Sequence, residues 1–136
     1  MGGMITGFTY NNGLLKEKQT ITMLTPDFKG RSGAADIHIS PDGKFLYGSN
    51  RGDANELAIY SVKRNGILVH VSNQSAMGRT PRNFAIDPTG KFLLVANQDS
   101  GEIVVFLRNK KTGQLTPLEE KVKVSRPVCL KFVSKN

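Results

Sequence analysis

The chain is a succession of short apolar runs bounded by glycine, proline, asparagine or aspartate, and no stretch has the 3.6-residue spacing of an amphipathic helix. This pattern is typical of an all-β protein. We expect strands near residues 5–10, 14–23, 35–40, 44–49, 56–62, 67–73, 82–87, 91–96, 102–108, 115–124 and 128–133.

One unit of this pattern is repeated. Residues 39–50 return at 86–97, 47 positions later, with seven of twelve residues identical. Both copies contain Ile-x-Pro-x-Gly-Lys-Phe-Leu, in which proline presets φ for a turn and glycine accepts a positive φ. A repeat slightly longer than ~40–45 residues, built from short strands, is typical of the four-stranded blades of a β-propeller.

The repeat divides the chain into fewer than three blades of antiparallel, meander-connected strands. We expect a blade remnant at 4–24, complete blades at 34–74 and 81–125, and a final strand at 127–133, all in one partial propeller domain, 1–136. Because propellers close with ~4–8 blades, two blade faces are left uncovered. The chain is therefore expected to be a piece of a longer protein, or to self-associate through its open faces.

One strand in each complete blade is apolar on both faces. Residues 103–107 read Ile-Val-Val-Phe-Leu, and residues 57–60 read Leu-Ala-Ile-Tyr. Strands of this composition are expected in sheets that are covered on both sides. Stacked blades would provide that cover.

Strand parity sorts the loops, because successive connections in a meander alternate between the two ends of a sheet. The Pro-x-Gly-Lys turns fall on one end, together with the lysines at positions 44, 63, 91, 110 and 111. Most arginines fall on the other end: Arg31, Arg51, Arg79, Arg82 and Arg126. Arginine suits carboxylate and phosphate, so we predict an anion site there. Arg51 and Arg82 adjoin the innermost strands, and Asn83 and Gln98 are further candidates. The alternative is that loops simply collect polar residues.

The two histidines and two aspartates near the arginines are candidate chemical groups. His38 lies on an expected innermost strand, where it would line a central channel as a base or substrate ligand. The alternative is a hydrogen-bonded structural histidine. His70, on an outer strand, is expected at the surface. Asp36 and Asp53 would act as acid–base groups or pair with the arginines.

Composition narrows the remaining function classes. Nineteen basic against eleven acidic residues give a net charge of +8, but no basic run is interleaved with aromatics, which disfavours nucleic acid as a partner. The single cysteine, Cys129, and two histidines leave no metal centre, and the motifs of serine hydrolases, phosphate loops and dinucleotide folds are missing. We expect no metal and no cofactor. The apolar stretch 4–10 is neither a signal peptide nor a membrane span, so we expect a cytoplasmic location and no membrane partner.

Three segments, 34–52, 80–98 and 126–132, resemble the lactonase-type seven-bladed β-propeller family. They carry Ser-Asn-Arg-Gly after the first Pro-Asp-Gly-Lys turn, Thr-Pro-Arg-Asn before the second turn, and a closing Arg-Pro-Val-Cys-Leu-Lys-Phe. The family contains bacterial 6-phosphogluconolactonases and fungal carboxymuconate cyclases. The similarity runs from about residue 5 to the end of the chain, and the chain resembles the C-terminal portion of such a protein.

The resemblance implies a hydrolase that opens a sugar-acid lactone of the pentose phosphate pathway without a metal or organic cofactor. It implies a central cleft in which Arg51 binds the substrate's anionic group or stabilises an oxyanion, with Arg82 and Asn83 facing the same cleft. The family's histidine and glutamate come from blades that this chain lacks. The catalytic residues of this chain therefore stay unknown.

Two function classes stay open. The first is an incomplete 6-phosphogluconolactonase-like lactone hydrolase, active or inactive, whose partner is an anionic sugar lactone. The second is a non-catalytic propeller fragment that serves as an assembly or interaction module. The two repeat copies diverge after their last asparagine, with Arg51 in one and Gln98 in the other, and we expect function to concentrate there.

Overall fold

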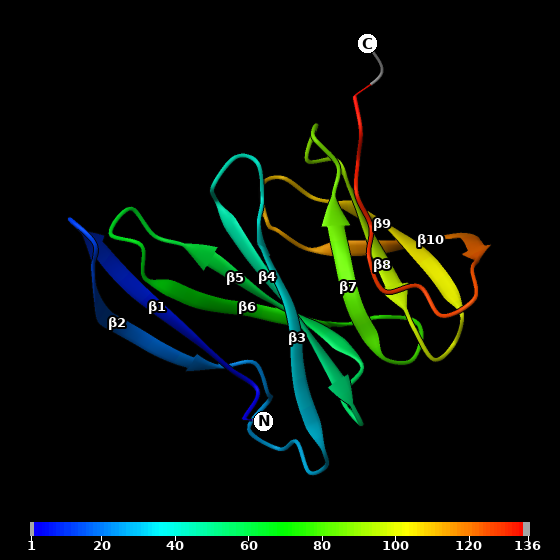
Figure 1. Ribbon diagram of the computed structural model, residues 1–136, viewed down its shortest axis with the longest axis horizontal. Coiled ribbons are helices and arrows are strands. Elements are labelled where there is room, and N and C mark those ends of the chain that lie inside the picture. The colour runs from blue at the N-terminus through cyan, green and yellow to red at the C-terminus, as the bar shows by residue number, and fades with distance from the viewer. Residues whose placement is uncertain (1, 135–136) are drawn as a thin grey trace.

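A computed structural model, which describes residues 2–134, contains ten β-strands in three antiparallel sheets that stand side by side (Figure 1). The strands are β1 (Met4–Asn11), β2 (Leu14–Thr22), β3 (Ser32–Ile39), β4 (Phe45–Gly52), β5 (Glu56–Val62), β6 (Leu68–Ser75), β7 (Pro81–Ile86), β8 (Phe92–Asn97), β9 (Glu102–Arg108) and β10 (Leu115–Lys123). Each sheet contains consecutive strands, β1–β2, β3–β6 and β7–β10. The predicted all-β partial propeller is confirmed. Residues 2–134 hold no helix that could cross a membrane.

The expected final strand at 127–133 is wrong, because this segment forms no strand in the structure. A strand needs a ladder partner, and no described segment pairs with these residues. The segment instead passes β7 and β8 (Figure 1). The backbone N–H of Leu130 donates to Oδ1 of Asn83 at 2.6 Å.

The middle sheet, β3–β6, is packed on both faces. On one face Tyr47 and Ile59 join a core with Phe84 and Phe106 of the third sheet. On the other face Tyr60 packs against β1 and β2 in a second core that includes Ile5 and Met23. The two cores explain why β4 is buried at six consecutive positions, 45–50.

The two apolar strands differ in their cover. Residues 57–60 of β5 are all buried, as a sheet covered on both faces requires. Residues 103–107 of β9 alternate instead, with Val104 and Phe106 buried and Leu107 exposed. The prediction of two covered faces is wrong for β9, because no further sheet lies beyond the third one within residues 2–134.

A buried arginine joins the second and third sheets at the end that carries the Pro-x-Gly-Lys turns. The guanidinium of Arg108 is fully buried and donates to the Tyr47 hydroxyl, the Gly90 carbonyl and the Asp42 carboxylate at 2.8, 2.8 and 3.2 Å. Burial would raise the pKa of Asp42, but hydrogen bonds from Ser40, the backbone of residue 44 and Arg108 lower it to about 2. Burial raises the pKa of Tyr47. This end is therefore fixed by an internal ion pair.

Candidate functional site

The opposite end of the sheets contains a hollow of about 360 Å³ between the innermost strands β3 and β7, called the inner hollow below. Its lining residues are Ala34, Ala35, Asp36, Arg51, Arg82, Asn83 and Val128. Three of the five candidate binding residues, Arg51, Arg82 and Asn83, thus line one hollow. Because the neighbours on β3 are alanines, no large side chain fills the space.

Arg51 is held against the backbone of β3 at the end of β4. Its Nε donates to the carbonyl of Gly33 at 3.3 Å and its Nη2 to the carbonyl of Ala34 at 3.4 Å. The fully buried Asn50 fixes the same stretch, because its Oδ1 accepts the N–H of Gly33 at 2.9 Å. The half-buried guanidinium therefore keeps a defined position with further N–H donors to spare.

Arg82 is the second residue of β7 and its side chain is exposed. Neither Arg82 nor Arg51 has a carboxylate within 4 Å among residues 2–134. Two guanidiniums without a carboxylate partner in one hollow create a local positive potential. An anion with planar or tetrahedral oxygens would match their donors.

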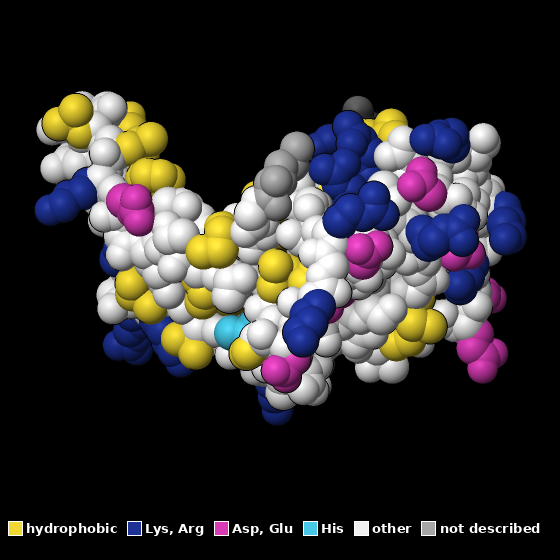
Figure 2. All heavy atoms as spheres, turned by 90° about the horizontal axis from the view of Figure 1, so that it is seen from below, with side chains coloured by type: hydrophobic (Ala, Val, Ile, Leu, Met, Phe, Trp, Pro, Cys, Tyr) yellow, Lys and Arg dark blue, Asp and Glu magenta, His cyan; other side chains and the backbone are white. Residues whose placement is uncertain are grey.

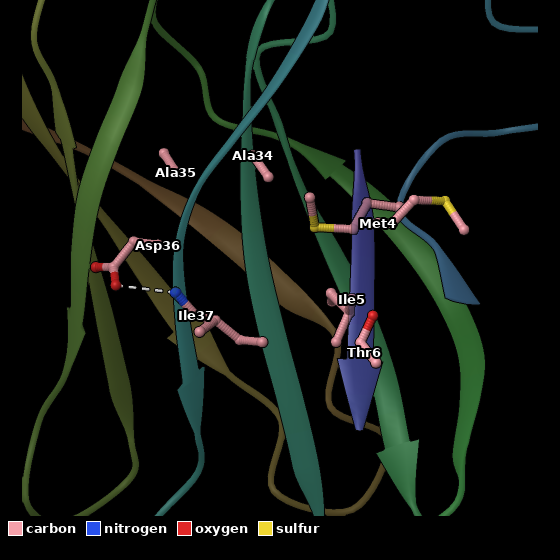
Figure 3. A pocket seen from close by; sticks show the side chains of 8 residues that line it. Met4, Ile5, Thr6, Ala34, Ala35, Asp36 and Ile37 are labelled. Atoms are coloured by element: carbon pink, nitrogen blue, oxygen red, sulfur yellow. Dashed lines mark hydrogen bonds between the residues drawn. The ribbon is translucent and has the colours of Figure 1, made fainter. Parts of the chain in front are cut away.

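Asp36, the acidic residue of the hollow, is already saturated by protein hydrogen bonds. Its Oδ2 accepts from His38 Nε2 at 3.0 Å, Asn83 Nδ2 at 2.6 Å and the N–H of Phe84 at 3.1 Å. Its Oδ1 accepts the N–H of Ile37 at 2.9 Å, and Figure 3 shows the carboxylate directed away from β1, with Ile37 directed toward β1. Asp36 thus fastens β3 to β7 and pairs with a histidine, not with an arginine.

Asn83 repeats this role one blade further on. Its Nδ2 binds Asp36, and its Oδ1 accepts from Leu130. Positions 36, 83 and 130 are spaced by the 47-residue repeat, so the same strand position links successive innermost segments. Only one amide N–H of Asn83 is left for a ligand, and its part in substrate binding stays a prediction.

His38 and Gln98 do not line the inner hollow. His38 reaches it only through Asp36, and its ring meets the edge of Phe84 with centroids 4.8 Å apart. Gln98 contributes its backbone N–H to the carbonyl of Thr80 at 2.9 Å. Binding roles for His38 and Gln98 stay predictions.

The remaining polar candidates have local partners. Exposed His70 bonds Asn73 at 2.6 Å, in agreement with its expected surface position. Asp53 pairs with Arg31 at 3.7 Å, as one of the two alternatives predicted. Sequence reasoning missed Asp36 as a hub between strands. The acidic or amide residue at both 36 and 83 was the signal that could have found it.

A second hollow, of about 230 Å³, lies between β1 and β3 (Figure 3). Met4, Ile5, Met23 and Ile37 give it an apolar lining without basic residues. Among residues 2–134 no three metal-binding side chains come together. The arginines predicted to bind an anion therefore line the inner hollow and not this second one.

Comparison with known proteins agrees with this architecture. The family model described as "Lactonase, 7-bladed beta-propeller" matches residues 1–132. The chain is 53% identical over 94 residues to a 6-phosphogluconolactonase of Formosa agariphila, covering 68% of the chain and 27% of that protein. It is 39% identical over 122 residues to the 6-phosphogluconolactonase of Bacillus subtilis, covering 89% and 35%.

The structure superimposes on that of a periplasmic gluconolactonase of Pseudomonas aeruginosa with a TM-score of 0.94 and 40% identity, covering 98% of the chain and 37% of that protein. The chain thus spans about a third of the length of these relatives. Its correspondence to their C-terminal portion stays a prediction. The chain belongs to the seven-bladed β-propeller lactonase family.

Proposed function

We propose that the chain supplies the anion-binding wall of a 6-phosphogluconolactonase-type site, which hydrolyses a sugar-acid lactone. The observation that carries this proposal is the pair of arginines, Arg51 and Arg82, that share one hollow and have no carboxylate partner within residues 2–134. A lactone carbonyl becomes an oxyanion when water attacks it, and guanidinium donors stabilise that charge.

The steps of lactone hydrolysis indicate what Arg51 and Asp36 would do. Water adds to the carbonyl carbon and the ring C–O bond breaks. One proton of the water passes to the ring oxygen, the other is released to solvent, and the product leaves as a hydroxy acid carboxylate. Arg51 is anchored by two backbone carbonyls, so it would hold the oxyanion without reorganisation. We assign no catalytic base to this chain, because the Asp36 carboxylate is already committed to four hydrogen bonds.

Hydrolysis of 6-phosphogluconolactone tests the proposal, followed as acid release at constant pH. We expect the chain to exceed the buffer rate, and Arg51→Ala to lower the excess by roughly 100-fold, the order found for loss of one oxyanion donor. Arg64→Ala is the matched control, because Arg64 is exposed and lies outside the inner hollow. A rate equal to buffer, or an equal loss in both variants, would refute a lactonase role.

A second candidate function, assembly through open faces, is favoured by the exposed apolar residues of β1 and β2. Tyr10 and Leu15 are paired across these strands and are 74% and 66% exposed, with Phe8 at 52%. Figure 2 shows hydrophobic side chains gathered on the lobe at the left, the end of the molecule that β1 and β2 form in Figure 1. Apolar clusters of this kind mark interaction surfaces.

Light scattering separates the two functions. For a chain of 14.9 kDa, the assembly proposal expects a multiple of that mass, which returns to the monomer mass in a Tyr10→Ser, Leu15→Ser variant. Loss of lactone hydrolysis in that variant would show that hydrolysis depends on assembly. A monodisperse monomer at all concentrations argues against assembly.

A further inference from the structure

The inner hollow continues outward through two more hollows along the junction of the second and third sheets. The next hollow, of about 420 Å³, is lined by Ser32, Gly33, Arg51, Gly52 and Thr80 and shares Arg51 with the inner hollow. The last, called the outer hollow, has about 330 Å³ and shares Gly52 and Thr80. Its full lining is Arg31, Gly52, Asn55, Arg79, Thr80 and Asp99. Shared walls make the three hollows one groove.

The outer hollow has its own unpaired cation. Arg79 has no carboxylate within 4 Å among residues 2–134, and its Nη2 meets only the backbone carbonyl of Asp99 at 3.5 Å. Arg31, in contrast, pairs with Asp53. The carboxylate of Asp99 is used by Arg126 at 3.6 Å and by Thr80. The guanidinium of Arg79 is therefore free to bind an anion.

The backbone between Arg79 and Arg82 is strained at Thr80. This β-branched residue has φ of +58° and precedes Pro81, a combination that sterics disfavour. Three contacts hold it there. Asn55 Oδ1 accepts its N–H at 2.8 Å, its hydroxyl donates to Asp99 Oδ2 at 2.5 Å, and Gln98 N–H donates to its carbonyl at 2.9 Å.

Strain of this kind persists only where the surroundings impose it, often at ligand sites. Arg79, directly before Thr80, lines the outer hollow, while Arg82, three residues later, lines the inner hollow. The strained residue thus stands between two cations that line the two ends of one groove.

We propose that the outer hollow is a second anion subsite, in which Arg79 binds a phosphate-like group of a ligand whose other anionic or carbonyl end lies in the inner hollow. The proposal rests on the proposed function only in placing a sugar acid in the inner hollow. Its consequence is selectivity, because a doubly charged sugar acid would engage both hollows and a singly charged one only the inner hollow. The Arg79 side chain would set that preference.

Calorimetric titration with gluconate and with 6-phosphogluconate tests this subsite. We expect the unaltered chain to bind 6-phosphogluconate roughly tenfold more tightly, the equivalent of one charge-assisted hydrogen bond. Arg79→Gln should reduce the ratio to roughly twofold or less while the gluconate affinity stays unchanged. Arg51→Gln should weaken both ligands. Arg64→Gln, an exposed arginine away from the groove, should leave the ratio unchanged.

Equal affinities for the two ligands in the unaltered chain, no binding of either, or an unchanged ratio in Arg79→Gln would overturn the subsite. The experiment is independent of turnover. An Arg79-dependent ratio in a chain that hydrolyses no lactone would support the subsite and refute the lactonase role. Arg51-dependent hydrolysis with a ratio of one would do the reverse.

Discussion

Arg108 is the last residue of β9 and Arg51 the last but one of β4, and the two lie at opposite ends of the stacked sheets. Arg108 is fully buried and pairs with Asp42, with short bonds to a tyrosine hydroxyl and a carbonyl. Arg51 is half-buried, makes two long bonds of 3.3 and 3.4 Å and has no acidic partner among the residues that the structure describes. The same residue type thus serves cohesion at one end and stays available to a ligand at the other.

The two arginines therefore differ in what they contribute to the free energy of folding. A buried ion pair contributes by fixing a geometry, since removal of one partner leaves buried polar groups unsatisfied. An unpaired arginine near solvent contributes little to folding and gains from an incoming anion. Stability experiments should therefore find the turn end sensitive and the arginine end tolerant.

The largest expected effect is that of Arg108→Ala. The change leaves the Gly90 carbonyl without its donor and opens a space beside Tyr47, so we expect the free energy of unfolding to fall by about 3 to 4 kcal/mol. Urea denaturation measures it. A loss below about 1 kcal/mol would show that the buried pair is not what holds the turn end together.

A smaller effect is expected from Gly113→Ala in the hairpin that packs on the same end. Gly113 has φ of +77°, and an added methyl would overlap the ring of Phe45. We expect a loss of about 2 to 3 kcal/mol from backbone strain plus overpacking. The matched control is Gly43→Ala, with φ of +69° and open space around its Cβ, for which strain alone predicts about 1 kcal/mol. Equal losses would mean that packing on Phe45 is unimportant.

Arg51 and Arg108 also show how much of the structure could be predicted from the sequence. The strands and the Pro-x-Gly-Lys turns followed from local alternation and turn chemistry, and strand parity placed Arg51 and Arg82 on one end. The role of Arg108 was missed, although its parity with the buried Val104 and Phe106 marked it. Its partner Asp42 lies 66 residues away, and only the packing of two sheets brings them together.

The expected strand at 127–133 failed for a related reason. Its apolar pattern was suitable, but a strand exists only where a neighbour accepts its hydrogen bonds. In the same way the hydrogen bonds that occupy Asn83 depend on Asp36 and Leu130, each 47 residues away. Local pattern thus predicts which segments are extended, while contacts between blades decide which polar groups remain free.

Lowering the pH tests the ion pair between Asp42 and Arg108 at the end that carries the Pro-x-Gly-Lys turns. The folded pKa of Asp42 is about 2, below its ordinary 3.8, so the unfolded chain takes up a proton first as the pH falls. The stabilisation is complete above about pH 4 and is lost as the pH falls toward 2. Because Asp42 is partly exposed to solvent, which screens the interaction, we expect it to amount to about 1 kcal/mol.

Urea denaturation between pH 5 and 2 measures this loss. In Asp42→Asn, the free energy of unfolding should fall over this pH range by that much less than in the unaltered chain. The variant should still lose some stability as the pH falls, because the pKa of Asp87 is lowered too. Burial acts to raise this pKa, but hydrogen bonds from Thr89 and the backbone lower it. Parallel profiles for Asp42→Asn and the unaltered chain would contradict the assigned pKa.

The smallest effect belongs to Arg51→Ala, and it is the complement of Arg108→Ala. Arg51 gives up only two long hydrogen bonds to backbone carbonyls, beside a hollow that water can enter. We expect the free energy of unfolding to change by less than about 0.5 kcal/mol. Urea denaturation on the samples used for lactone hydrolysis measures it, so that loss of activity and loss of fold are read from the same protein. A stability loss as large as that of Arg108→Ala would make Arg51 a structural tie, and the contrast between the two ends would then fail.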